Sequence, residues 1–295
     1  MKFIQIFAFL ILFFPLGCTP KEETYHAPIR IAYPHWAEGE ALTFLAESFL
    51  QEIGYNVVTK CISVELIYYS LNTGSQDLFL DAWLPETHEF YYEKYKENLE
   101  ILSTVIDNAR IGLVVPTYVP IKSIEELQDA SEMFQGRIIG IDKGAGIMKQ
   151  TEDAIEAYDL SHFKLYSSSE KNMITVLSFS IKKRLPVVIT GWDYHWKFQR
   201  YNLRFLEDPK SIFSKSDKIK IVTRKNFSSD RPDLAKLLKN FKITPEDFKS
   251  LLNTYRLMNT KSEKKAAISQ WLHKKHPELI QSWKISSPSK KEQGI

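Results

Sequence analysis

Three tryptophans lie at or directly after apolar, strand-like stretches of the sequence. They are Trp36, Trp83 and Trp192, and each is accompanied by Pro, Gly or charged residues that are rare in a hydrophobic core. Ligands of open α/β sheets bind outside the carboxyl ends of the strands, so these rings are expected to converge on one site. The negative faces of several indole rings attract a large, weakly hydrated cation. The sequence therefore predicts a protein that binds such a cation.

A glycine turn, Gly144-Ala145-Gly146, stands between another apolar stretch and a helical pattern. The N-terminus of a helix with little side-chain bulk offers unpaired backbone N–H groups and the positive end of the helix dipole. That combination favours a carboxylate. A phosphate is disfavoured because the following residues, 147–150, lack the Gly-Lys-Ser/Thr of a P-loop. With a hydrogen bond from a single histidine, this turn predicts an anion subsite.

Three histidines beside the tryptophans allow a different hypothesis. His35, His88 and His195, together with Glu38 or Asp193, could form the metal site of a metal-binding lipoprotein. Their spacing is long-range, and no His-x-x-x-His or Cys-x-x-Cys pair supports it. Catalytic motifs are also missing, since the sequence has no Gly-x-Ser-x-Gly, His-Glu-x-x-His or dinucleotide fingerprint. We therefore expect that the protein is not an enzyme and has no cofactor. After a binding protein and a metal-binding lipoprotein, an extracytoplasmic enzyme that acts on a quaternary amine is the third alternative.

Strand-like and helical stretches alternate along the chain, which predicts an α/β fold with parallel strands and right-handed crossovers. Strands are expected at 29–33, 56–62, 77–81, 111–115, 137–141, 163–166, 186–190 and 218–223. Helices are expected at 39–53, 64–72, 144–157, 169–183, 229–239, 244–257 and 262–282. The pattern suggests two lobes, with 28–115 plus 219–285 in lobe 1 and 116–218 in lobe 2. Hinge closure would bury a ligand bound in the cleft between them.

The N-terminal segment differs sharply from the rest. Residues 1–17 combine one early lysine, an apolar stretch and a small-residue end, as a signal peptide does. Cys18 follows a glycine, as in bacterial lipoprotein processing sites, and we expect its lipidation rather than an ordinary cleavage beside an incidental cysteine. Residues 18–27 would then form a polar tether, and the lysine-rich residues 286–295 a disordered tail.

The composition is that of an ordinary globular protein, with 44% hydrophobic and 25% charged residues. A formal net charge of +3 over 295 residues gives no long-range reason to expect nucleic acid as a partner. With Cys18 acylated, Cys61 is the one remaining cysteine. We therefore expect no intramolecular disulfide, and Cys61 is expected to be a small buried hydrophobe.

Several stretches of the sequence together resemble the glycine betaine-binding proteins, which are the substrate-binding proteins of ABC importers for glycine betaine and related quaternary amines. The similarity extends from about residue 28 to 285. The stretches that carry it are Trp83-Leu84-Pro85-Glu86-Thr87-His88, Gly112-Leu113-Val114-Val115-Pro116, Gly140-Ile141-Asp142, Gly144-Ala145-Gly146-Ile147-Met148, Gly191-Trp192 with His195-Trp196, and Leu206-Glu207-Asp208-Pro209-Lys210.

The resemblance implies a two-lobed periplasmic-binding-protein fold of type II, with the ligand in the interlobe cleft. Trp36, Trp83 and Trp192 would form an aromatic box around a trimethylammonium group. The protein would be exported and would act as a monomer. A lipid anchor would hold it at the outer face of the cytoplasmic membrane or in the periplasm, where it would deliver its ligand to the transmembrane subunit of an ABC permease.

The resemblance also implies how the other end of the ligand is held. The backbone amides of Gly146 and Ile147, with the side chain of His88, would bind a carboxylate. Glycine betaine is the first choice of ligand. The family commonly has a proline where this chain has Tyr194, and Asp193 adds an acidic group beside the box. Asp193 could favour a ligand with a hydroxyl or a lower net negative charge, which leaves choline, carnitine and proline betaine open.

Overall fold

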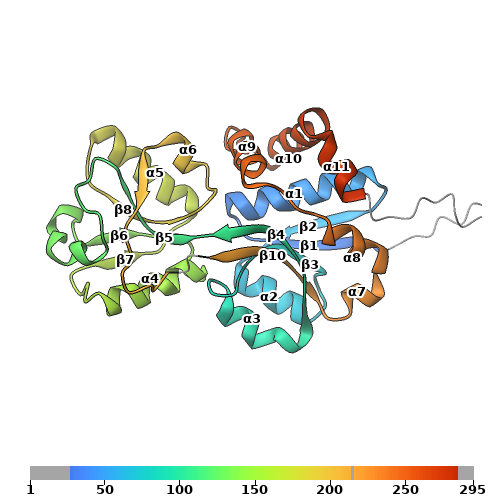
Figure 1. Ribbon diagram of the computed structural model, residues 1–295, viewed down its shortest axis with the longest axis horizontal. Helices are drawn as coiled ribbons and strands as arrows, with labels where there is room; N and C mark the ends of the chain where they lie inside the picture. The colour runs from blue at the N-terminus through green and yellow to red at the C-terminus, as the bar shows by residue number, and fades with distance from the viewer. Residues whose placement is uncertain (1–26, 214–215, 285–295) are drawn as a thin grey trace, which may run out of the picture.

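The computed structural model describes residues 27–213 and 216–284. Its strands and helices form two lobes that lie side by side, each built around one five-stranded sheet (Figure 1). The predicted α/β fold class is therefore confirmed. The predicted signal peptide, the lipidation site at Cys18, most of the tether and the C-terminal tail lie outside the described residues.

The sheet of the first lobe has the strand order β2-β1-β3-β10-β4. Its strands are β1 (Ile29–Tyr33), β2 (Val57–Cys61), β3 (Leu78–Leu84), β4 (Leu99–Ala109) and β10 (Asp217–Arg224). β1 pairs in parallel with β2 and β3, as strand–helix–strand crossovers require, whereas β10 runs antiparallel to β3 and β4. Every residue of β3 is buried, which is typical of a strand covered on both faces.

The sheet of the second lobe has the strand order β7-β6-β8-β5-β9. Its strands are β5 (Ile111–Pro116), β6 (Arg137–Ile139), β7 (Lys164–Tyr166), β8 (Val188–Trp192) and β9 (Leu203–Phe205). β6 pairs in parallel with β7 and β8, and β5 runs antiparallel to β8 and β9. Each lobe thus has a parallel part and an antiparallel strand through which the chain enters or leaves.

The strand pairing corrects the predicted lobe boundaries. Residues 111–115 were expected in lobe 1, but β5 lies in the second sheet, so the first crossing is near Arg110, between β4 and β5. The return crossing ends at Asp217, where β10 begins, two residues before the predicted position. An apolar strand shows from its sequence that it is buried, but not which of two adjacent sheets it joins.

Helices cover both faces of each sheet. The first lobe has α1 (Ala37–Glu52), α2 (Val64–Asn72) and α3 (Glu89–Tyr95), followed by a 3₁₀ turn at Lys96–Asn98. In Figure 1, α1 lies over one face of the first sheet, and α2 and α3 lie over the other. The second lobe has α4 (Gly146–Ala157), α5 (Glu170–Lys183) and α6 (Lys197–Arg200), with 3₁₀ turns at Glu125–Ala130 and Glu132–Phe134.

The C-terminal helices pack on the first lobe, where α9 and α10 contact α1. They are α7 (Phe227–Asp230), α8 (Pro232–Lys239), α9 (Pro245–Tyr255), α10 (Lys261–Gln270), a π-helical turn (Trp271–Lys275) and α11 (Pro277–Lys284). The prediction of a single helix at 262–282 is therefore wrong, because the helical conformation is interrupted at His276. Pro277 has no N–H to continue the ladder, and its ring clashes with the carbonyl of the preceding turn.

Two expectations about single side chains have opposite outcomes. Trp271 and Trp283 are each 1% exposed within the core, as expected of packing residues. Cys61 is exposed, so its predicted burial is wrong. Cys61 ends β2, which is an edge strand of the first sheet, so less of the protein covers it.

None of the helices in the described part of the chain has the length and apolarity needed to cross a membrane.

Candidate ligand-binding site

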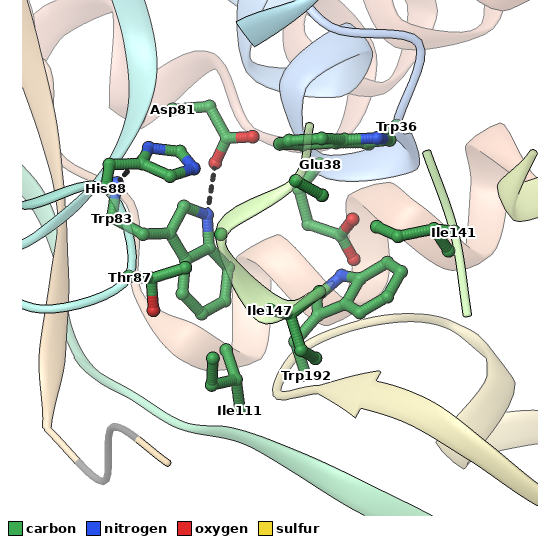
Figure 2. Close-up of a pocket in the computed structure, with 12 residues that line it drawn as sticks. Trp36, Glu38, Asp81, Trp83, Thr87, His88, Ile111, Ile141, Ile147 and Trp192 are labelled. Atoms are coloured by element: carbon green, nitrogen blue, oxygen red, sulfur yellow. Dashed lines mark hydrogen bonds between the residues drawn. The ribbon is translucent and has the colours of Figure 1, made fainter. Parts of the chain in front are cut away.

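A pocket lies between the two lobes; the space between its atoms is about 350 Å³, which includes open solvent at its mouth. Figure 2 shows side chains from both lobes around it. The lining residues are Trp36, Glu38, Asp81, Trp83, Thr87, His88, Ile111, Ile141, Ala145, Gly146, Ile147 and Trp192. All six residues expected to bind the ligand are among them.

The three tryptophans reach the pocket from different elements. Trp36 is the residue immediately before α1, whereas Trp83 lies inside β3 and Trp192 is the last residue of β8. Two of the three rings thus belong to strands rather than to the turns that follow them. Their exposed fractions are 9%, 4% and 6% respectively. The three tryptophans lie at or shortly after the carboxyl ends of β1, β3 and β8, and all three line one pocket, as the sequence pattern predicts.

Hydrogen bonds hold two of the rings in place. The indole Nε1 of Trp36 donates to Asp142 Oδ2 at 3.0 Å, and this bond joins the first lobe to the second. The indole Nε1 of Trp83 donates to Asp81 Oδ1 at 2.9 Å within the same strand (Figure 2). Both indole N–H groups are therefore satisfied, and the apolar parts of the rings remain available to a ligand.

Further contacts join the lobes around the pocket. The backbone N–H of Ala37 donates to Glu170 Oε2 at 3.0 Å, and the hydroxyl of Tyr91 donates to the carbonyl oxygen of Gly144 at 2.8 Å. Gly146 approaches the first lobe so closely that a Cβ atom there would lie 2.8 Å from the carbonyl carbon of Thr87. The lobes are thus closed upon each other, and a side chain at position 146 would separate them.

The N-terminus of α4 faces this closed space. The helix begins at Gly146, after Ala145 in an extended conformation, and the first-turn residues Gly146 and Ile147 line the pocket. First-turn amides have no intrahelical acceptor, and the helix dipole adds positive charge there. Because Gly146 has no side chain, none of its own atoms separates its amide from the pocket. The arrangement suits a carboxylate.

His88 presents a neutral ring to the pocket. The backbone N–H of Trp83 donates to His88 Nδ1 at 3.1 Å, so the ring carries its proton on Nε2. Figure 2 shows the second nitrogen on the side away from this hydrogen bond. Burial lowers the pKa of His88 to about 3. His88 is therefore a hydrogen-bond donor without charge at neutral pH.

The turn that carries His88 is fixed by a residue that sequence reasoning missed. The backbone N–H groups of Glu86 and Thr87 donate to the Asp217 carboxylate at 2.8 and 3.0 Å. The Thr87 hydroxyl also donates to the same carboxylate. Asp217 begins β10 and is fully buried. No local pattern links it to a turn about 130 residues earlier, so only the antiparallel pairing of β10 with β3 reveals the contact.

Two carboxyl groups line the pocket that sequence reasoning did not place among the ligand-binding residues. Glu38, in the first turn of α1, is 1% exposed, and neither of its oxygens has a hydrogen-bond partner among the described residues. Burial, and then Glu170, raises the pKa of Glu38 well above its usual range. The charge of Lys197 and then the indole N–H of Trp192, which faces the carboxylate (Figure 2), oppose the rise of this pKa. Burial raises the pKa of Asp81 to about 8. Alternation along a strand, which puts Asp81 on the same face as Trp83, is the signal that could have identified it.

The structure does not bring the three candidate metal ligands together. The His35 side chain is 69% exposed and pairs with Glu40 at 2.9 Å. His195 Nε2 pairs with Glu170 Oε1 at 3.0 Å, and His88 binds the backbone as described above. In the part of the chain that the structure describes, no three His, Cys, Asp or Glu side chains are grouped to hold a metal ion. The metal-binding hypothesis is therefore wrong for these residues.

Asp193 also lies outside the pocket, contrary to the expectation that it acts beside the box. The backbone N–H of Arg110 donates to Asp193 Oδ2 at 3.0 Å, and the Arg110 guanidinium lies 3.4 Å from Oδ1. Asp193 therefore holds the crossing between β4 and β5. The acidic residues that do line the pocket are Glu38 and Asp81.

Comparisons with known proteins agree with this geometry. The family described as the substrate binding domain of ABC-type glycine betaine transport system matches residues 27–274. The glycine betaine/carnitine transport binding protein GbuC of Listeria monocytogenes serotype 1/2a (strain 10403S) is 34% identical over 158 residues. That match covers 53% of this chain and 51% of the relative, so the chain matches about half the length of GbuC.

Two solved structures are similar over most of both chains. Lactococcal OpuAC, in its closed conformation with glycine betaine, has a TM-score of 0.82 and 30% identity, covering 88% of this chain and 99% of its own. The glycine betaine/L-proline-binding protein ProX from Borrelia burgdorferi has a TM-score of 0.84 and 29% identity, covering 90% and 98%. These similarities confirm the two-lobed periplasmic-binding-protein fold. The chain belongs to the family of substrate-binding domains of ABC-type glycine betaine transport systems.

Proposed function

We propose that the protein is the extracytoplasmic solute-binding component of an ABC importer, and that its ligand is glycine betaine or a related quaternary ammonium compound. One observation carries the proposal: three indole rings, the N-terminus of α4 and a neutral histidine line the same interlobe pocket. Indole faces attract a quaternary ammonium group, and helix N-termini attract a carboxylate. Glycine betaine has both groups on a short chain.

Isothermal titration calorimetry with four ligands tests this function. We expect saturable binding of glycine betaine at one site and weaker binding of choline, which lacks the carboxylate. Carnitine and proline betaine carry both charged groups but are bulkier, so the small pocket should bind them less tightly than glycine betaine. Absence of binding by all four compounds would contradict the proposed function.

Substitution of His88 tests the carboxylate end of the site. His88→Ala should weaken glycine betaine more than choline, because choline has no carboxylate to lose a contact with. The loss of one hydrogen bond to a charged group should cost on the order of 1.5–3 kcal/mol. Any disturbance of the Trp83 backbone, which His88 also contacts, affects both ligands alike and cancels in the comparison. Equal losses for the two ligands, measured by calorimetry, would show that His88 does not contact the anionic group.

We further propose that the protein is exported and held at the membrane by a lipid on Cys18, so that it can deliver its ligand to a permease as a monomer. The Gly17-Cys18 junction after an apolar segment supports this anchor. A single acyl chain gives only marginal membrane binding, so stable attachment requires at least two.

Cys18→Ser is expected to move the protein from the membrane fraction to the soluble fraction of a bacterial host. The unaltered protein should carry an acylated cysteine at its mature N-terminus, detectable by mass spectrometry. Ligand affinity should be the same for both forms, since the pocket lies within the two lobes. Unaltered protein found in the soluble fraction with an unmodified N-terminus would exclude the anchor.

A further inference from the structure

Glu38 places a carboxyl group in the pocket that has no well-formed hydrogen bond with the described residues. The residue is 1% exposed, and neither carboxylate oxygen makes a well-formed hydrogen bond with the described residues, although the Trp192 indole N–H faces the carboxylate. Figure 2 shows the carboxylate between the rings of Trp36 and Trp192. Burying a carboxylate without a partner is costly, and such groups are rare in folded proteins. Its position in a ligand pocket indicates that the missing partner is the ligand.

Lys197 is the cation that the protein itself provides nearby, and its charge opposes the rise of the Glu38 pKa, but no salt bridge or hydrogen bond joins these two described side chains. Its side chain is fully buried, and its ammonium lies 3.8 Å from the centre of the Trp192 ring. Its Nζ atom, like the Glu38 oxygens, has no hydrogen-bond partner among the described residues. Trp192 lines the pocket, and Lys197 is not among the lining residues.

The position of Lys197 changes what Trp192 can do for a ligand. A cation held over one face of an aromatic ring uses the negative potential on which a cation–π contact depends. A second cation beside the same ring is then also repelled by the ammonium of Lys197. The tryptophan rings alone are therefore a weaker cation site than their number implies, and a negative charge beside Trp192 offsets the repulsion.

We propose that Glu38 is the counter-ion of the ligand's quaternary nitrogen, and that it selects cations over neutral molecules of the same shape. A quaternary nitrogen has no N–H, so its counter-ion needs no hydrogen bond from it. A carboxylate that makes no well-formed hydrogen bond with the described residues and lies between two indole rings fits that requirement. The inference rests on the proposed function. It adds one charged residue, Glu38, to the aromatic residues that line the ammonium subsite.

Glu38→Gln tests the role of charge, because the amide keeps the shape of the side chain and removes its charge. The probes are glycine betaine, choline and 3,3-dimethylbutan-1-ol, in which carbon replaces the quaternary nitrogen of choline. We expect Glu38→Gln to bind choline and glycine betaine at least about tenfold more weakly by calorimetry. The affinity for the neutral alcohol, measured by competition, should stay the same or increase.

Glu40→Gln is the matched control. Glu40 lies two residues further along the same helix and is 5% exposed, but it pairs with Lys264 at 2.7 Å and does not line the pocket. It should change thermal stability and leave all three affinities unchanged. Equal losses by Glu38→Gln for the alcohol and the cations, or undiminished binding of the cations, would contradict this inference alone. Failure of the unaltered protein to bind either cation would contradict the proposed function, and with it this inference.

The pH dependence of choline binding provides a second measurement. The charged or titratable groups around Glu38 are Asp81 on β3, Glu170 on α5 and Lys197 on α6, and the Trp192 N–H on β8 faces it. Burial raises the pKa of Glu38, and the ligand binds its ionised form, so affinity should fall as the pH decreases through that raised pKa. Glu38→Gln should show a flatter profile, because the other groups remain. Identical profiles for the two proteins would contradict the inference.

Discussion

Gly146→Ala is expected to weaken the binding of glycine betaine tenfold to more than a hundredfold while both lobes remain folded. A Cβ atom at this position would lie 2.8 Å from the carbonyl carbon of Thr87 and closer still to its oxygen. Thr87 belongs to the first lobe and Gly146 to the second, so the clash opposes closure rather than the folding of either lobe. Overpacking of this kind costs roughly 1–3 kcal/mol and occasionally more, which gives the expected loss of affinity.

Gly144→Ala is the matched control for this substitution. A Cβ atom there would lie 3.4 Å from the Tyr91 hydroxyl, which is an ordinary van der Waals distance. It should change affinity by less than about threefold, since a contact at that distance requires little adjustment. Calorimetry measures the affinities, and circular dichroism without ligand measures the melting temperatures. If Gly146→Ala bound glycine betaine as tightly as the unaltered protein, closure at this contact would not be needed.

Removal of any one box tryptophan is expected to weaken glycine betaine binding about tenfold or more. A desolvated cation–π contact contributes roughly 2 kcal/mol, and truncation to alanine also opens the pocket to water. Trp36→Ala should have an additional effect, because the Trp36 indole joins the lobes through Asp142. Trp192→Ala should cost least of the three, since Lys197 already occupies one face of that ring.

Trp271→Ala separates loss of binding from loss of stability. Trp271 is 1% exposed in the core of the first lobe and donates to Ser250 at 3.1 Å, away from the pocket. Its truncation should lower the free energy of unfolding by about 3–5 kcal/mol and leave the ligand affinity unchanged. Unchanged affinity in all three box variants would mean that the rings do not hold the ligand.

Most elements of the fold follow from local patterns in the sequence. The strand at 29–33 and the helix at 64–72 have the predicted bounds, because short apolar stretches and amphipathic periodicity are local properties. β4 (Leu99–Ala109) was not predicted, because polar residues interrupt its apolar ones and it contains no turn signal. Its membership in the sheet depends on pairing with β10, more than a hundred residues later.

The candidate site was predictable to the extent that it depends on side-chain type. Indole rings and a glycine at a helix start indicate their chemistry directly, so Trp36, Trp83 and Gly146 could be selected from the sequence. The roles of Glu38 and Lys197 could not, because a charged residue in a sequence is expected to be solvated. Both are buried in the structure, where the two lobes are closed upon each other.

The most direct test of the account is a crystal structure of the protein with bound glycine betaine. We expect the quaternary nitrogen within van der Waals contact of the rings of Trp36, Trp83 and Trp192. The carboxylate should accept hydrogen bonds of 2.7–3.2 Å from the amides of Gly146 and Ile147. A ligand bound outside the interlobe pocket, or one whose carboxylate faces the indole rings, would contradict the account.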